Sequence, residues 1–161
     1  MIKNKKTARP GDKNRFEQEK IIVARMGKEV AADYDDKGYY VKDGMLLLKK
    51  SNETNLKYLL GVLNSKLINY YYKNYFITVD VLKNALLELP VVVYKKEKCI
   101  TELVDQMLCL QKQLHEKNLS GNEKERLEQQ IKNIDYEIDQ EVYKLYGLTK
   151  EEIKIVEESL R

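Results

Sequence analysis

Histidine and cysteine are scarce in this sequence of 161 residues, and each scarcity excludes a kind of site. His115 is the only histidine, so a histidine-based metal centre or catalytic triad is nearly excluded. Cys99 and Cys109 stand ten residues apart on one predicted helix. This arrangement suits two reduced thiols in a cytoplasmic protein better than a disulfide or a metal site. We therefore expect no metal.

Proline and paired glycines are also rare, which argues against catalytic chemistry. Pro10 and Pro90 are the only prolines, so an Asn/Asp-Pro-Pro-aromatic loop that clamps a flipped base for amino methylation is impossible. No Gly-x-Gly motif follows a predicted strand, so no nucleotide or adenosyl cofactor is expected. The acidic clusters at 135–141 and 151–152 are most simply solvated helix faces. We expect a chain with no cofactor and no catalytic centre of its own.

Long apolar runs are missing as well. The basic N-terminus is not followed by the apolar segment of a signal peptide. The most apolar stretch, residues 56–76, is interrupted by Lys57, Lys66 and Lys73, which makes a bilayer span unfavourable. No membrane partner is expected.

Charge is distributed unevenly along the chain. Residues 1–98 hold 20 Lys and Arg against 12 Asp and Glu, whereas residues 99–161 hold 9 against 14. The first 28 residues alone carry 9 basic and 3 acidic groups. This asymmetry indicates that the first half faces a polyanion, although Lys-rich termini are also often simply solvated.

The sequence is organised around residues 56–76, which predict one long amphipathic helix. One face carries leucines, among them Leu56, Leu60 and Leu63, and the opposite face carries Tyr58, Gly61 and other residues. Apolar surface on two sides predicts a helix sandwiched between layers. Gly61 and Ser65 lie one turn apart, so we expect the sheet or the helical hairpin to approach closely there.

The segments on either side of this helix predict an α+β fold. Residues 20–49 alternate β-favouring runs with Asp-Gly turn signals and predict a three- or four-stranded antiparallel meander. Residues 51–55 are rich in residues that cap helices, and residues 81–88 predict a second helix that stops before Pro90. From about residue 96, two heptad seams around a polar turn predict an antiparallel helical hairpin.

Helix caps refine this second half. Ser120 with Glu123, and Thr149 with Glu152, are capping boxes, and Gly147 suits a helix C-terminus. The predicted architecture is a small antiparallel β-sheet packed on a central helix, followed by the hairpin and a short C-terminal helix. We divide it into a basic lobe, 1–95, and an acidic helical part, 96–161.

Three stretches of the sequence form recognisable motifs. The first runs through residues 8–27 and ends in KIIVARMG, the second is YLLGVLNSKLI with its trailing tyrosines and the later Leu89-Pro90, and the third is IDQEVYKLYGLT. Together they resemble the TaqI-like C-terminal specificity domain of adenine-specific DNA methyltransferases and fused type II restriction-modification enzymes. They occur in the family's order. The LNSK helix also occurs in type I specificity subunits, whereas the VYKLYGLT ending is more specific.

The resemblance implies a target-recognition module that reads a short duplex sequence while a methyltransferase domain, and in some enzymes a nuclease domain, performs the chemistry. Family members usually carry the methyltransferase on the same polypeptide, N-terminal to this region, and it is absent here. We therefore expect the chain to be either an excised domain or a remnant reading frame.

Site residues follow from this implied role. Arginine reads guanine through a bidentate contact in the major groove, and lysines bind phosphates. The base-reading candidates are Arg9, Arg15, Arg25, Tyr39 and Tyr40. The phosphate-contact candidates are Lys13, Lys28, Lys42, Lys66 and Lys73.

The acidic hairpin is expected to brace the recognition lobe against a methyltransferase domain or a second subunit, or simply to complete the fold. A rival interpretation takes the hairpin as a docking or dimerisation module that does not bind DNA. The two heptad seams support it.

Overall fold

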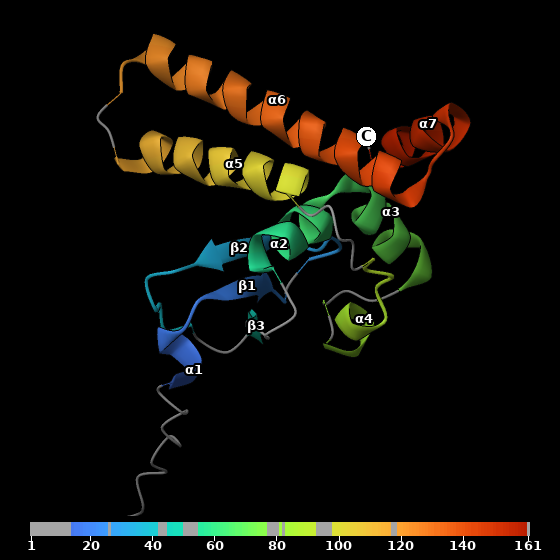
Figure 1. Ribbon diagram of the computed structural model, residues 1–161, viewed down its shortest axis with the longest axis horizontal. Coiled ribbons are helices and arrows are strands. Elements are labelled where there is room, and N and C mark those ends of the chain that lie inside the picture. The colour runs from blue at the N-terminus through green and yellow to red at the C-terminus, as the bar shows by residue number, and fades with distance from the viewer. Residues whose placement is uncertain are drawn as a thin grey trace, which may run out of the picture.

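The computed structural model describes residues 14–25, 27–41, 45–49, 55–76, 81, 83–92, 98–116 and 119–160 (Figure 1). Within these residues the chain forms three strands and seven helices, in the α+β arrangement that the sequence predicts. Their order is α1 (Asn14–Glu17), β1 (Lys20–Ala24), β2 (Ala32–Asp35), β3 (Met45–Lys49), α2 (Leu56–Asn64), α3 (Lys66–Tyr75), α4 (Lys83–Leu87), α5 (Lys98–Glu116), α6 (Gly121–Tyr146) and α7 (Lys150–Ser159).

The sheet is antiparallel, with β1 at its centre and the strand order β2-β1-β3. The meander prediction was wrong in this respect, because β3 pairs with β1 and residues 39–41 belong to a loop. Burial explains the order. Ile21 and Val23 of β1 are fully buried, whereas β2 carries Asp33 and Asp35. The central position makes β1 the most buried of the three strands, and a meander would have left it at an edge.

The predicted long helix over 56–76 is in fact two helices. The chain leaves helical geometry at Ser65, whose ψ is 151°. The Ser65 side chain donates to the Val62 carbonyl and accepts from the Ile68 N–H, so it caps the N-terminus of α3. Asn64, the last residue of α2, turns toward the sheet and bonds β2.

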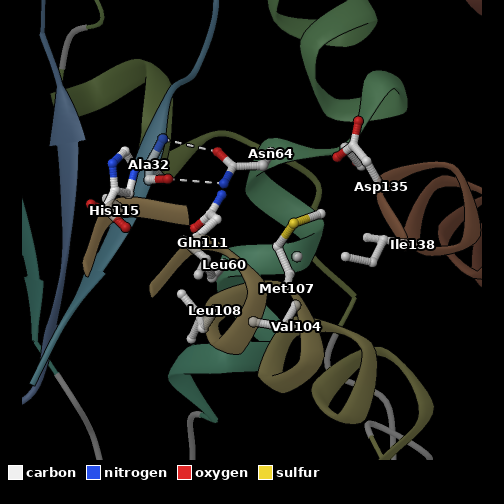
Figure 2. Close-up of a pocket in the computed structure, with 13 residues that line it drawn as sticks. Ala32, Leu60, Asn64, Val104, Met107, Leu108, Gln111, His115, Asp135 and Ile138 are labelled. Atoms are coloured by element: carbon white, nitrogen blue, oxygen red, sulfur yellow. Dashed lines mark hydrogen bonds between the residues drawn. The ribbon is translucent and has the colours of Figure 1, made fainter. Parts of the chain in front are cut away.

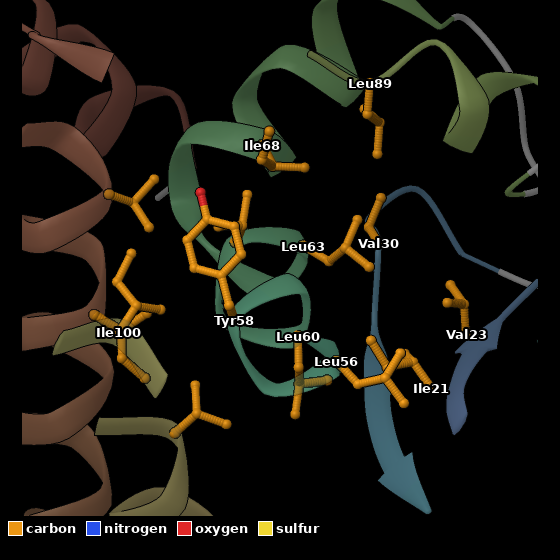
Figure 3. Close-up of a cluster of buried hydrophobic side chains, with 14 of the residues drawn as sticks. Ile21, Val23, Val30, Leu56, Tyr58, Leu60, Leu63, Ile68, Leu89 and Ile100 are labelled. Atoms are coloured by element: carbon orange, nitrogen blue, oxygen red, sulfur yellow. The ribbon is translucent and has the colours of Figure 1, made fainter. Parts of the chain in front are cut away.

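Helix α2 lies between the sheet and the hairpin, as the two-sided apolar pattern predicts (Figures 1 and 3). Leu56 and Leu63 point toward Ile21 and Val30 on the side of the sheet, and Ile100 of α5 lies on the opposite side (Figure 3). One buried cluster joins side chains of the sheet, of α2 and α3, and of α5 and α6. The division into two lobes at residue 95 remains a prediction.

The hairpin approaches α2 closely at Gly61. A Cβ added there would lie 2.8 Å from Cγ2 of Ile100 and 2.9 Å from Cγ2 of Val104. Ser65, one turn later, is 2% exposed. The expected close approach is therefore confirmed, and the hairpin makes it.

The helical caps form as predicted. Asn55 accepts from the N–H groups of Lys57 and Tyr58 at the start of α2. Both capping boxes, at the starts of α6 and α7, are complete, and Gly147 ends α6 with a φ of +68°. The predicted helix over 81–88 is realised in its middle as α4.

Among the helices described here, none combines the length and the apolar character needed to cross a bilayer.

Candidate functional site

Two predicted base-reading residues, Tyr39 and Tyr40, stand exposed beside the short helix α1. Their side chains are 57% and 64% exposed. They belong to the loop that follows β2, which runs back toward α1 (Figure 1). The Tyr40 ring stacks on Phe16 of α1, with ring centroids 4.9 Å apart. We call the surface formed by α1 and residues 36–41 the tyrosine face.

A buried ion pair lies directly beneath this face. Lys20 begins β1 and is 0% exposed, and Asp35 ends β2 and is 2% exposed. The two residues are partners in the β1–β2 register, and their side chains form a salt bridge. The Lys20 ammonium group also donates a hydrogen bond to the Phe16 carbonyl. The pair therefore joins the sheet to α1.

The Asp35 carboxylate also organises the loop. It accepts hydrogen bonds from the backbone N–H groups of Lys37, Gly38 and Tyr39 at 2.9, 3.0 and 2.8 Å. Burial alone would raise the pKa of Asp35. The hydrogen bonds from Lys20 and from the loop amides outweigh that effect and hold this pKa below its ordinary value. Asp35 is thus a charged acceptor at the centre of the loop.

Gly38 lets the loop pack against α1. Its φ is +78°, a backbone conformation that residues with a side chain rarely adopt. A Cβ added there would lie 3.5 Å from the Glu17 Cα and from the Phe16 carbonyl oxygen. The tyrosine face is consequently one packed unit.

Arg25 and Lys28 lie at the other end of β1. Both are exposed, and the Arg25 carbonyl accepts a hydrogen bond from the Val81 N–H at 2.6 Å. β1 has five residues, and at about 3.3 Å per residue it separates the two ends by roughly 15 Å. Among the described base-reading candidates, Tyr39 and Tyr40 therefore lie at one end of the sheet and Arg25 lies at the other.

Other candidates lie wholly or partly outside the described residues. Arg9, Lys13 and Lys42 are outside them. The backbone of Arg15 forms part of α1, within the tyrosine face, but the position of its side chain is not described.

Lys66 and Lys73 face the helical part of the protein. The Lys66 Nζ lies 3.0 Å from the buried carboxylate of Asp139 on α6. Burial alone would lower the pKa of Lys66, but the hydrogen bond to Asp139 outweighs it and raises this pKa. The Lys73 Nζ donates to the Ser159 carbonyl of α7 at 2.8 Å. Both lysines hold helices together, and their predicted contact with phosphates remains a prediction.

A cleft of about 290 Å³ lies between β2 and the hairpin (Figure 2). Its wall includes Asn64, whose side-chain amide donates to the Ala32 carbonyl and accepts from the Ala32 N–H, each at 2.9 Å. This pairing covers the outer edge of β2, as another strand would. The sequence analysis missed this role of Asn64, because nothing local in the sequence indicates the edge of a sheet.

Further polar contacts join the hairpin to the first half of the chain. Asn55 donates to Thr101 at 3.0 Å, and Lys57 forms an ion pair with Asp105. The Tyr146 hydroxyl donates to the Pro90 carbonyl at 2.7 Å. The Tyr146–Pro90 contact brings together two of the segments in which the sequence resembles a known family.

No group of three or more His, Cys, Asp or Glu that could hold a metal ion occurs in the described part of the chain. The fold is a small α+β domain whose exposed loops carry aromatic and cationic side chains, braced by a helical hairpin.

The family model of the TaqI-like C-terminal specificity domain matches residues 1–91. Because the match spans more than half of the chain, the protein belongs to this family, and the resemblance seen in the sequence is confirmed. The family suggests a DNA sequence-specificity domain of restriction-modification enzymes. The IDQEVYKLYGLT stretch and the hairpin lie beyond the matched residues. No curated protein matches the chain.

Proposed function

We propose that this chain recognises a specific sequence in double-stranded DNA, as the specificity domain of a restriction-modification methyltransferase or fused endonuclease. The observation that carries the proposal is the family match over residues 1–91. The chemistry then belongs to an adenine-specific methyltransferase domain, and in a fused enzyme also to a nuclease domain, on the same or a partner chain. This chain supplies recognition and no catalytic centre.

Charge supports this proposal. The excess of Lys and Arg lies in residues 1–98, and the excess of Asp and Glu lies in residues 99–161. Cations on phosphates provide most of the sequence-independent affinity for DNA and orient the protein on the duplex. The sheet end of the molecule therefore faces DNA, and the acidic hairpin faces away from it.

The residue types of the candidates suit two different kinds of DNA contact. Arginines such as Arg9, Arg15 and Arg25 are suited to guanine edges, and Tyr39 and Tyr40 offer aromatic surface with a polar hydroxyl. Lys13, Lys28 and Lys42 are suited to phosphates. Lys66 and Lys73 lie farther back, against the helices, so any phosphate contact by them would be secondary.

The hairpin serves as the brace. Its apolar contact at Gly61 and its polar contacts through Thr101, Asp105 and Asp139 fix it to the helices that support the sheet. A rigid mount allows a neighbouring methyltransferase domain to be held at a defined position relative to the recognised base pairs. Docking of that domain on the hairpin is part of the proposal.

DNA binding is tested by titrating labelled duplexes at several salt concentrations. Neutralising phosphates releases counterions, so log affinity should fall linearly with log salt, with a slope of roughly −0.9 per phosphate contact. If the protein binds no duplex at low salt, even with the cognate methyltransferase present, the proposal is contradicted.

One observation favours a second function, that of a protein-interaction or dimerisation module. The seam residues Leu110, Leu114, Leu127 and Ile131 of the hairpin remain partly exposed. Replacing Arg9, Arg15 and Arg25 together by alanine separates the two functions. Under the leading proposal DNA binding collapses, whereas under the alternative partner binding persists and wild-type protein shows no affinity for DNA.

A further inference from the structure

We infer that Lys20 and Asp35 are positioning residues for sequence recognition, and that the tyrosine face is the surface that contacts base edges. This inference rests on the proposed function and deepens it, because it selects one of the two ends of the sheet. It also assigns a role to a buried ion pair at one end of the sheet.

Burial of the pair calls for an explanation. Removing two opposite charges from water costs several kcal/mol per ion, and hydrophobic residues of similar volume often stabilise a core at least as well. Lys20 and Asp35 are at most 2% exposed. Stability alone therefore does not account for an ion pair at this position.

The geometry that the pair imposes on the loop explains why an ion pair occupies this buried position. Asp35 gathers the N–H groups of Lys37, Gly38 and Tyr39 on one carboxylate. An apolar residue at position 35 could fill the space but could not accept these three hydrogen bonds. The carboxylate therefore fixes the backbone that presents Tyr39 and Tyr40.

The lysine fixes the other half of the same face. Lys20 donates to the Phe16 carbonyl, and the Phe16 ring stacks on Tyr40. The helix and the loop are thus held from below by one ion pair and joined above by one aromatic stack. A surface ordered before binding avoids the entropic cost of immobilising side chains in the complex.

The tyrosine face has one advantage over the opposite end. It presents two tyrosines that are more than half exposed, and aromatic side chains with a polar tip suit contact with base edges and sugars. Under this inference Arg25, which the proposed function leaves as a guanine reader, contacts phosphates together with Lys28 at the opposite end.

The test selects duplexes from a randomised pool with the full wild-type chain, and then measures a specificity ratio, the Kd of a shuffled duplex divided by the Kd of the enriched duplex. Asp35→Asn and Lys20→Met should each lower this ratio about tenfold or more, the typical effect of losing one base contact. The Kd for the shuffled duplex and its salt slope should stay within about twofold, because the phosphate contacts remain.

Asp139→Asn is the matched control, because it also breaks the pair of a buried carboxylate with a lysine, but this pair joins α6 to α3, away from the tyrosine face. It should leave the ratio unchanged. Hydrogen exchange supplies a readout of loop geometry: the amides of Lys37, Gly38 and Tyr39 should lose protection in Asp35→Asn and keep it in Asp139→Asn.

A variant with both Tyr39→Ala and Tyr40→Ala guards against unfolding, since both side chains are largely exposed. The double variant should fold, and its specificity ratio should fall as it does in Asp35→Asn and Lys20→Met. Retention of the ratio in this variant, or in folded Asp35→Asn and Lys20→Met, overturns the inference while the proposed function stands. A wild-type chain that enriches no sequence contradicts the proposed function itself, and the inference with it.

Discussion

The buried carboxylate of Asp139 accepts a hydrogen bond from the backbone N–H of Lys66 at 2.8 Å, and its second oxygen lies 3.0 Å from the Nζ of the same lysine. Lys66 is the first residue of α3. Asp139 thus satisfies one of the amides that a helix leaves free at its N-terminus, and places negative charge at the positive end of the helix dipole. A residue 73 positions away along the chain completes the cap.

We predict that Asp139→Ala lowers the free energy of unfolding by about 1–3 kcal/mol, the typical cost of leaving a buried hydrogen-bonding group without its partner. Asp139→Asn should cost less, because its oxygen can still accept from Lys66 and because burial already raises the pKa of the Asp139 carboxyl. Urea unfolding measures both. Asp135→Ala, one turn earlier and exposed, is the control and should change stability by less than about 0.5 kcal/mol.

Gly61→Ala should destabilise the protein although alanine is the better helix former. Alanine favours a helix by about 1 kcal/mol over glycine, but the new methyl group would lie within 3 Å of Ile100 and Val104. Overpacking of this kind costs about 1–3 kcal/mol, so a net loss is expected. Gly121→Ala adds a methyl group that meets nothing within 4 Å. Equal thermal unfolding of the two variants would contradict the close approach of the hairpin.

Asn64→Ala should open the outer edge of β2. The variant loses both hydrogen bonds to the Ala32 backbone, and a typical hydrogen bond contributes about 0.5–1.5 kcal/mol. The Ala32 amide should then exchange its hydrogen faster. Asn74→Ala is a suitable comparison, because Asn74 is exposed and its side-chain amide donates to the Tyr70 carbonyl within α3. An unchanged exchange rate at Ala32 would show that Asn64 does not hold the strand.

Asp35 should make stability fall at acid pH. Its folded-state pKa is lower than its ordinary value, so the unfolded chain takes up a proton at a higher pH than the folded protein does. The stabilisation is complete above the ordinary aspartate pKa of about 3.9 and is lost as the pH falls through the lower folded value. Urea unfolding at several pH values from 7 to 3 should show a smaller acid loss for Asp35→Asn than for wild type. Parallel curves would contradict this.

Local sequence signals predicted the helical part of the fold well. Capping boxes, Gly147 and the heptad seams depend on residues a few positions apart, and each is realised. The strand order and the break at Ser65 were missed because they depend on distant partners. Hydrophobic periodicity continues across Ser65, and only the edge of β2, which Asn64 covers, shows why the helix ends there.

The candidate site was predictable in residue type but not in arrangement. Tyr39 and Tyr40 are exposed, as a recognition role requires, yet the ion pair that orders their loop joins residues 15 positions apart on two strands. Lys66 was predicted to contact phosphates, and nothing in the sequence indicated that its ammonium group would lie 3.0 Å from the Asp139 carboxylate. A lone lysine in a sequence does not indicate which carboxylate the fold will bring to it.

The central claim, that this chain reads duplex sequence, is tested most directly by competition. The labelled duplex enriched by selection is bound at physiological salt and then displaced either by its unlabelled copy or by copies with single base pairs replaced. The account predicts that each replaced base pair in the recognised sequence weakens competition about tenfold, in line with a cost of about 1–3 kcal/mol per mismatch. Equal competition by every replaced duplex would mean that the chain binds DNA without reading it.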